Sequence, residues 1–216
     1  GVASLFGPGM ADGPFPEHYE PLECPVEKNM MSPQMNNPVI KRWDKKGVGT
    51  ALDEVASCDP RFPFVCSTYR VSEHWQTGVL TRWCPWLAEM QPEMFVEMSE
   101  ELAKERGFKN GERVVVKSAR GEVEAVALVT PRFKPFKIGD TVIHQVGIPW
   151  HFGWITTADR PYNEGDKKAE VFTTGDAANL LTPTIGDANT MIPESKAFMV
   201  NVVKKVRKAL PDVPIG

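Results

Sequence analysis

The clearest alternation of apolar and polar residues occurs in two neighbouring segments, residues 113–118 and residues 122–130. A period of two is typical of a strand that buries one of its faces. Arg120-Gly121 lies between the segments and predicts a tight turn, so we expect an antiparallel hairpin. The apolar face of the second strand consists of Val123, Ala125, Ala127 and Val129.

Further short strands are predicted where β-branched and aromatic residues gather or alternate with polar ones. These segments are residues 62–68, 94–98, 141–146 and 197–203. One short helix is predicted to begin after Ser99, a good N-cap, and to end at Gly107. Many short strands with few short helices predict a mainly β fold, and in particular a β-barrel.

Residues 1–60 lack this periodicity. Their frequent prolines and glycines do not sustain a helix, because proline removes a backbone donor and restricts the residue before it. Phe15, Tyr19 and Trp43 are nevertheless too apolar for a free linker. We therefore predict that residues 1–60 form an extended, proline-rich arm that wraps another surface, and that residues 61–216 form the barrel. A disordered tail is the alternative for the arm.

Composition narrows the classes of function. The 216 residues are enough for one large domain, or for one domain with an arm. A net charge of −3 gives no electrostatic reason to expect a nucleic-acid partner. No apolar run approaches the roughly 20 residues that cross a bilayer, so no transmembrane segment is expected. The first residues lack both a Met and the pattern of a signal peptide, which predicts a piece of a longer protein.

The four cysteines do not have the spacing of a metal site. Cys24, Cys58, Cys66 and Cys84 show no two-residue spacing and no nearby histidine, so we expect no metal held by protein ligands in this chain. Free thiols and a single disulfide both remain open on composition alone.

The order of motifs resembles a known family. A strand, a Ser-capped short helix and the run from Gly107 to Ala127 are similar to the dinucleotide-binding domain that closes the large subunits of the molybdopterin oxidoreductases of the dimethyl sulfoxide reductase family. The resemblance covers residues 61–205, and it implies a double-psi β-barrel. Several shorter segments resemble the formate dehydrogenases in particular: residues 67–74, 146–153, 179–183, 186–189 and 193–196, together with residues 13–21 of the arm.

The resemblance implies a function for a longer enzyme. The chain would be the C-terminal part of a formate dehydrogenase catalytic subunit and would bind a bis molybdopterin guanine dinucleotide cofactor with molybdenum or tungsten. Formate is converted to carbon dioxide in such enzymes, or the reverse. The implied partners are the remainder of the large subunit and an iron-sulfur electron-transfer subunit, with an iron-sulfur cluster elsewhere in the enzyme. The expected location is the periplasm.

The resemblance also implies which residues contact the cofactor, and their chemistry suits a long ligand with a charged middle. Arg70 offers a fork of donors and Lys196 a mobile positive charge to a pyrophosphate. Glycines permit close backbone approach, and indole rings offer flat faces. The predicted contacts are Thr68, Arg70, His74, Trp75, Gln76, Thr77, Gly147, Trp150, His151, Gly153, Asn179 and Lys196.

Six of these residues also have a plain structural interpretation. Arg70 and Glu73 together suit a surface ion pair. His74 suits a hydrogen-bonded core histidine, and Trp150 with His151 suits closure of the barrel mouth. Asn179 suits a turn cap, and Lys196 suits a solvated charge.

No catalytic residue is predicted within this chain. It has no Ser-His-Asp order, no phosphate loop and no paired carboxylates in the context of a cleft. Two other functions remain open: the same domain of a nitrate or polysulfide type oxidoreductase, and a cofactor-free double-psi barrel that binds proteins. The implied relatives are exported, so we also consider a disulfide between Cys58 and Cys84, with four free thiols as the alternative. The disulfide would connect the two ends of the segment that contains residues 67–74.

Overall fold

The computed structural model describes most of the barrel and part of the arm. The described residues are 19–21, 23–31, 33, 57–153, 156–157, 171–173, 175–183, 186–187, 190, 192–193 and 195–205. Phe15 and Trp43, predicted as anchors of the arm, lie outside them. In the described part of the chain, no helix has the length and apolar character needed to cross a membrane.

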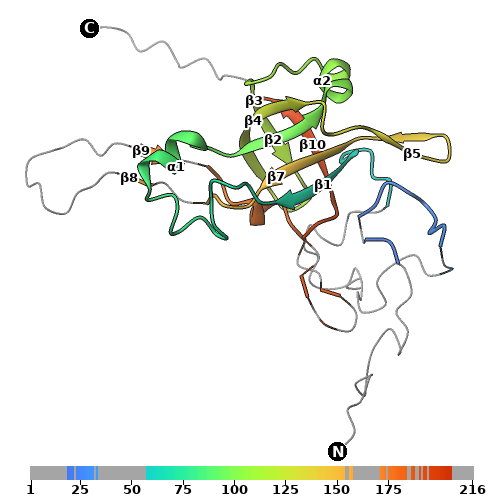
Figure 1. The fold of residues 1–216 in the computed structure, drawn as a ribbon. Helices are drawn as coiled ribbons and strands as arrows, with labels where there is room; N and C mark the ends of the chain where they lie inside the picture. Colours follow the sequence, from blue (N-terminus) through green and yellow to red (C-terminus); the bar gives the residue numbers. More distant parts are fainter. Residues whose placement is uncertain are drawn as a thin grey trace, which may run out of the picture.

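Six strands close into a barrel, as the sequence predicts (Figure 1). Their order around the barrel is β1-β10-β3-β4-β2-β7. Two of the contacts are parallel, β1 with β7 and β2 with β4, as expected for a double-psi barrel, and the others are antiparallel. The strands span Phe64–Tyr69 (β1), Phe95–Ser99 (β2), Arg113–Lys117 (β3), Glu122–Thr130 (β4), Gln145–Pro149 (β7) and Phe198–Lys204 (β10).

Short elements surround the barrel. The β5–β6 hairpin projects away from it, and α2 lies at one end (Figure 1). The bounds of these elements are Pro85–Met90 (α1), Glu100–Arg106 (α2), Phe136–Ile138 (β5), Thr141–Ile143 (β6), Thr156–Thr157 (β8), Val171–Thr173 (β9) and Ala178–Leu180 (a 3-10 helix, η2).

Local sequence explains the helix α2. The Ser99 hydroxyl accepts a hydrogen bond from the backbone N–H of Leu102 at 3.1 Å, and Gly107 ends the helix in the left-handed conformation at φ 70°. Glu100 and Glu101 meet the positive end of the helix dipole. Both predicted boundaries of this helix are confirmed.

Inward-facing side chains of the barrel follow the predicted alternation. Val123, Ala125 and Ala127 of β4 are buried, and their neighbours Glu122 and Glu124 are exposed. The other strands contribute Phe64, Cys66, Val96, Met98, Val114, Val116, Val146, Ile148, Phe198, Val200 and Val202 to the same core.

One predicted strand is wrong in its extent. Residues 141–146 were expected to form a single strand, but the structure divides them at His144 into β6 and β7. β6 pairs with β5 outside the barrel, whereas β7 joins the barrel between β1 and β2. The break is stabilised by His144, whose backbone oxygen accepts from Val65 at 3.1 Å and whose ring bonds Glu105 at 3.0 Å. Strand propensity alone does not reveal this change of partner.

The arm is held against its own barrel by a buried ion pair. Glu23 is 3% exposed, and its carboxylate accepts two N–H groups of Arg120, one of them at 3.0 Å. The same carboxylate accepts from the backbone N–H of Met199 at 3.0 Å, and Arg120 also donates to the backbone oxygen of Leu181 at 2.8 Å. One guanidinium thus joins the arm, the β3–β4 turn and the segment after η2.

All four cysteines are free thiols in the structure. The Cys58–Cys84 disulfide considered from the sequence is therefore not formed in it. Cys58 instead lies beside Cys24, since its backbone N–H donates to the Cys24 oxygen at 2.8 Å. Cys66 packs in the core, where burial raises the pKa of its thiol above the ordinary value.

We predict that Arg120→Ala frees the arm. The substitution leaves the Glu23 carboxylate buried without its cation, which costs about 3–5 kcal/mol. Hydrogen exchange of residues 23–31 is expected to accelerate roughly a hundredfold or more. Lys117→Ala is the matched control, because it breaks an exposed pair with Glu122 that contributes under about 1 kcal/mol. Equal exchange in both variants would contradict the prediction.

Candidate functional site

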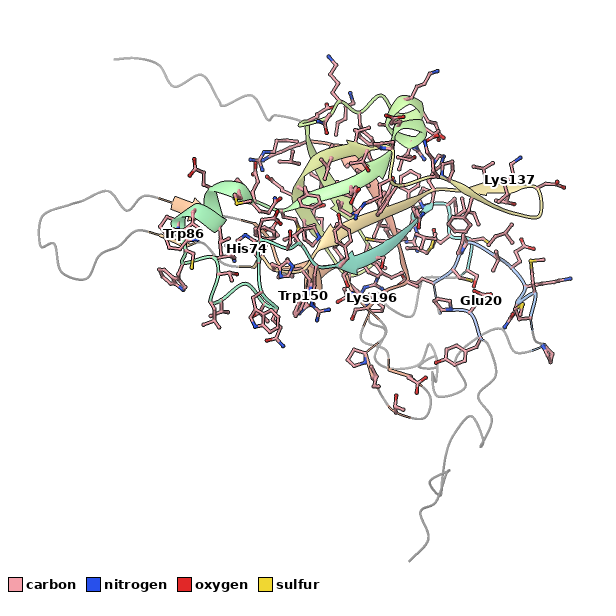
Figure 2. The ribbon with its side chains drawn as sticks, in the orientation of Figure 1. Glu20, His74, Trp86, Lys137, Trp150 and Lys196 are labelled. Carbon is pink, nitrogen blue, oxygen red and sulfur yellow. The ribbon has the colours of Figure 1, made fainter. Side chains whose placement is uncertain are left out.

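The predicted contacts lie on three loops, residues 68–77 (the first loop), 147–153 (the second loop) and 179–196 (the third loop). The described parts of these loops meet at one end of the barrel. Because β1 and β7 are parallel, with Thr68 opposite Ile148 and Tyr69 opposite Pro149, their C-terminal ends lie side by side. β10 begins at the same end, since Phe198 pairs with Cys66. The segments after β1, after β7 and before β10 therefore emerge together. Figure 2 shows His74, Trp150 and Lys196 along this side of the barrel.

Lys196 and Thr68 join the third loop to the first. The Lys196 ammonium donates to the backbone oxygen of Thr68 and, at 3.1 Å, to its hydroxyl. The Thr68 hydroxyl donates in turn to the backbone oxygen of Ser195 at 2.9 Å. Burial and the nearby charge of Arg70 both lower the pKa of Lys196. Two cations from separate loops thus lie close enough to repel one another.

Arg70 and Trp150 join the first loop to the second. The Arg70 guanidinium lies over the Trp150 ring, with its central carbon 5.1 Å from the ring centroid. This cation–π contact orients the arginine and leaves its side chain exposed. Within the described part of the chain, the structure shows no ion pair between Arg70 and Glu73. The donors of Arg70 therefore face outward at the end of the barrel where Lys196 lies.

His74 and His151 are both buried, and their rings form hydrogen bonds that hold the first loop and the segment after it in place. One nitrogen of His151 accepts from the backbone N–H of Val71 at 2.9 Å, and the other bonds the backbone oxygen of Gln76. His74 bonds the backbone oxygen of Gln91 at 2.8 Å and the hydroxyl of Thr81 at 3.3 Å. All four ring nitrogens have partners inside the protein, so these rings present no nitrogen to a ligand in this conformation.

Gly78 allows the first loop to close on His151. Its φ is +83°, and a Cβ there would lie 2.3 Å from the His151 backbone oxygen, so no side chain fits. Arg82, buried nearby, lies over the Phe152 ring at 5.2 Å. Sequence patterns did not single out Gly78 or Arg82, although glycine is the residue that permits close approach of two backbone segments.

The remaining predicted contacts divide by exposure. Gly147 is covered by Tyr69 and Phe133, and Gly153 packs on Ala177 with φ +140°. The side chains that stand in solvent at the loops are Trp75, Gln76, Thr77 and Asn179. Their contact with a cofactor stays a prediction.

A cavity of 610 Å³ adjoins Lys196, between the arm and the third loop. Tyr19 lines it and donates to a carboxylate oxygen of Asp187 at 3.4 Å. The other oxygen of Asp187 accepts from the backbone and the hydroxyl of Thr190, at 2.9 and 2.8 Å. Sequence patterns do not predict Tyr19, Asp187 or Thr190 as site residues, although the first two lie in segments that resemble the formate dehydrogenases. Contact between the arm and this loop depends on tertiary structure, which no local pattern encodes.

A barrel with two cations, an indole face and a mainly apolar cavity with a few polar groups at one end is typical of domains that bind an extended anionic ligand. Comparison with known families identifies the class. Residues 64–199 match the family described as molydopterin dinucleotide binding domain. The chain belongs to this family.

Individual relatives carry formate dehydrogenase names. The chain is 53% identical over 204 residues to formate dehydrogenase subunit alpha of Megalodesulfovibrio gigas. It is 43% identical to formate dehydrogenase 2 subunit alpha (cytochrome c-553) of Nitratidesulfovibrio vulgaris. It is 41% identical to the nitrate-inducible formate dehydrogenase major subunit of Escherichia coli K12. Each match covers 94% of this chain and 18% of the relative, so the chain spans about a fifth of their length.

We predict that the first loop loses stability in mild acid. Burial lowers the pKa of His151 below its ordinary value near 6.5. Since the folded loop holds the neutral ring, the opened loop binds more protons between the two pKa values, and stability falls as the pH drops below about 6.5. Hydrogen exchange of residues 71–78, corrected for intrinsic rates, is expected to show this slope. The slope should shrink in His151→Asn; an unchanged slope would assign the titration to another group.

Proposed function

We propose that this chain is the cofactor-binding C-terminal part of a formate dehydrogenase catalytic subunit and holds a molybdopterin guanine dinucleotide. The observation that carries the proposal is the convergence of Arg70 and Lys196 beside Thr68 at the mouth of a barrel of this family. Two cations held that close favour an anion between or beside them. Names of relatives at 41–53% identity support formate as the substrate of the whole enzyme.

The residues present suit such a cofactor. Its pyrophosphate needs forked and mobile cationic donors, which Arg70 and Lys196 supply. Its flat ring systems need apolar faces, and Trp75, which belongs to the first loop, is 67% exposed. The cavity beside Lys196, with the Asp187 carboxylate at its wall, offers space and acceptors for a purine edge.

The roles of the chain's own residues are binding and orientation. Arg70 and Lys196 hold the anionic middle of the ligand, while Thr68 fixes the Lys196 ammonium between its backbone oxygen and its hydroxyl. His74 and His151 keep the first loop in shape without contacting the ligand. When bound, the metal of the cofactor supplies the two-electron redox chemistry. Its protein ligand and the acid–base groups belong to the remainder of the large subunit under this proposal; the described residues contain no group of three potential metal ligands.

The exposed apolar side chains in and just before α1 fit a place inside a larger subunit. Trp83, Trp86 and Met90 are 56–67% exposed, although they are large and apolar. Patches of this kind mark interaction sites. We propose that the remainder of the large subunit covers them. We also propose that an iron-sulfur subunit is a partner and that the whole enzyme contains an iron-sulfur cluster. The proposed metal of the cofactor is molybdenum or tungsten, and the proposed location is the periplasm.

We predict that Arg70→Ala weakens cofactor retention without unfolding the barrel. A charge-assisted hydrogen bond to an anion contributes roughly 1.5–3 kcal/mol, or about ten- to a hundredfold in affinity. Guanine nucleotide released by acid and metal content per polypeptide measure the retention in the purified enzyme. Lys137→Ala, on the projecting hairpin, is the matched control. Wild-type content in Arg70→Ala would remove Arg70 from the site, and absence of guanine nucleotide from the native enzyme would overturn the function.

A further inference from the structure

A buried carboxylate lies on the outer side of the barrel wall, next to the loops. Glu97 of β2 has a side chain only 3% exposed. Its two oxygens accept from the Tyr69 hydroxyl at 2.7 Å, from the Thr130 hydroxyl at 2.7 Å and from two N–H groups of Arg132, one of them at 2.9 Å. We call Tyr69, Glu97, Thr130 and Arg132 the Glu97 network.

The Glu97 network connects β2 with the end of β1 across the intervening strand β7. Tyr69 ends β1, and Glu97 lies on β2, with β7 between them. The Tyr69 ring passes directly over Gly147 of β7, where a Cβ would lie 2.3 Å from the ring. Phe133 approaches the same point at 2.8 Å. Gly147 was predicted to allow close approach of a cofactor, but in the structure it allows close approach of the Tyr69 ring. Because Gly147 has no side chain, the Tyr69 hydroxyl can reach Glu97 across β7.

Tyr69 is fixed at both ends. Its hydroxyl is held by Glu97, and its backbone oxygen accepts from the N–H of Trp150 at 3.3 Å. Arg70 follows it in the chain and lies over the Trp150 ring at 5.1 Å. The direction in which β1 delivers Arg70 therefore depends on where the Tyr69 side chain is anchored.

The charge of Glu97 is maintained although the group is buried. Burial favours the neutral acid, but the hydrogen bonds from Arg132, Thr130 and Tyr69 outweigh it and lower the pKa of Glu97. Arg132 reaches it from a largely exposed position and also lies over the Tyr69 ring at 5.5 Å. The arginine therefore clamps both the carboxylate and the tyrosine from the outside.

We infer that the Glu97 network positions Arg70 and Trp150 for the cofactor, with Tyr69, Glu97 and Arg132 as positioning residues that do not touch the ligand. This inference rests on the proposed function. The inference extends the proposed function by naming the residues that hold Arg70 in position beside Trp150 of the second loop. A purely structural network would lower the stability of the barrel without acting through Arg70.

The test compares variants of the purified holoenzyme. Tyr69→Phe removes one hydroxyl and keeps the ring; Arg132→Gln removes the clamp from a surface position. Each is incubated at a raised temperature below unfolding, separated from free ligand, and assayed for retained guanine nucleotide. We expect the rate of loss to rise about tenfold, as for one charge-assisted hydrogen bond. Lys134→Gln, two residues from Arg132, breaks only the exposed pair with Glu101 and should behave as wild type.

A double variant separates positioning from general stability. If the network acts through Arg70, then Tyr69→Phe added to Arg70→Ala causes little further loss, since coupled residues are not additive. Additive losses would overturn the inference, as would wild-type retention in both Tyr69→Phe and Arg132→Gln. Loss in Arg70→Ala with retention in the network variants refutes the positioning role only, and full retention in Arg70→Ala removes Arg70 from the site and the inference with it. The proposed function itself fails if the native enzyme holds no guanine nucleotide.

Discussion

The parallel pairing of β1 with β7 determines where the predicted contact residues of this domain come together. Parallel neighbours deliver both of their following segments to the same end of a sheet, whereas antiparallel neighbours deliver them to opposite ends. Residues 70–77 and 150–153 are thereby adjacent although about 80 positions separate them. β10 pairs antiparallel with β1 and so brings the segment before it, with Lys196, to the same place. Arg70 and Lys196 would repel one another in an unfolded chain. The backbone hydrogen bonds between β1, β7 and β10 keep them close together in the folded barrel.

Polar groups beneath the site are satisfied internally, and this makes the exposed ones available. The ring nitrogens of His74 and His151 hydrogen-bond backbone and hydroxyl groups of residues 71–91. Buried polar groups without partners are costly, so the loops gain a defined shape from these bonds. A rigid inner layer then presents Arg70 outward with its orientation set by Trp150. His74 and His151 thus determine the shape of the first loop, whereas Arg70 and Lys196 provide the positive charge at this end of the barrel.

Much of the barrel could be predicted from sequence, because local rules determine it. The β3–β4 hairpin, the Ser99 cap and the Gly107 stop depend on residues a few positions apart, and the structure has them where the pattern predicts. The site is only partly predictable. Short polar motifs selected Arg70 and Lys196, whose contact with a cofactor stays a prediction. They did not show that the His151 ring hydrogen-bonds backbone groups of the first loop. Glu97 appeared only as one residue in a strand, because its partners Tyr69 and Arg132 are 28 and 35 positions away.

The Glu23–Arg120 pair has a consequence for the order of folding. Its carboxylate also requires the N–H of Met199, which lies on the last strand of the barrel. During synthesis the arm leaves the ribosome first, at about 5–20 residues per second, yet its docking site forms only after β10 has closed the barrel. Non-local pairing of this kind is slow relative to local contacts. Residues 23–31 therefore dock only after β10 has paired, and the Glu23 carboxylate remains in water until then.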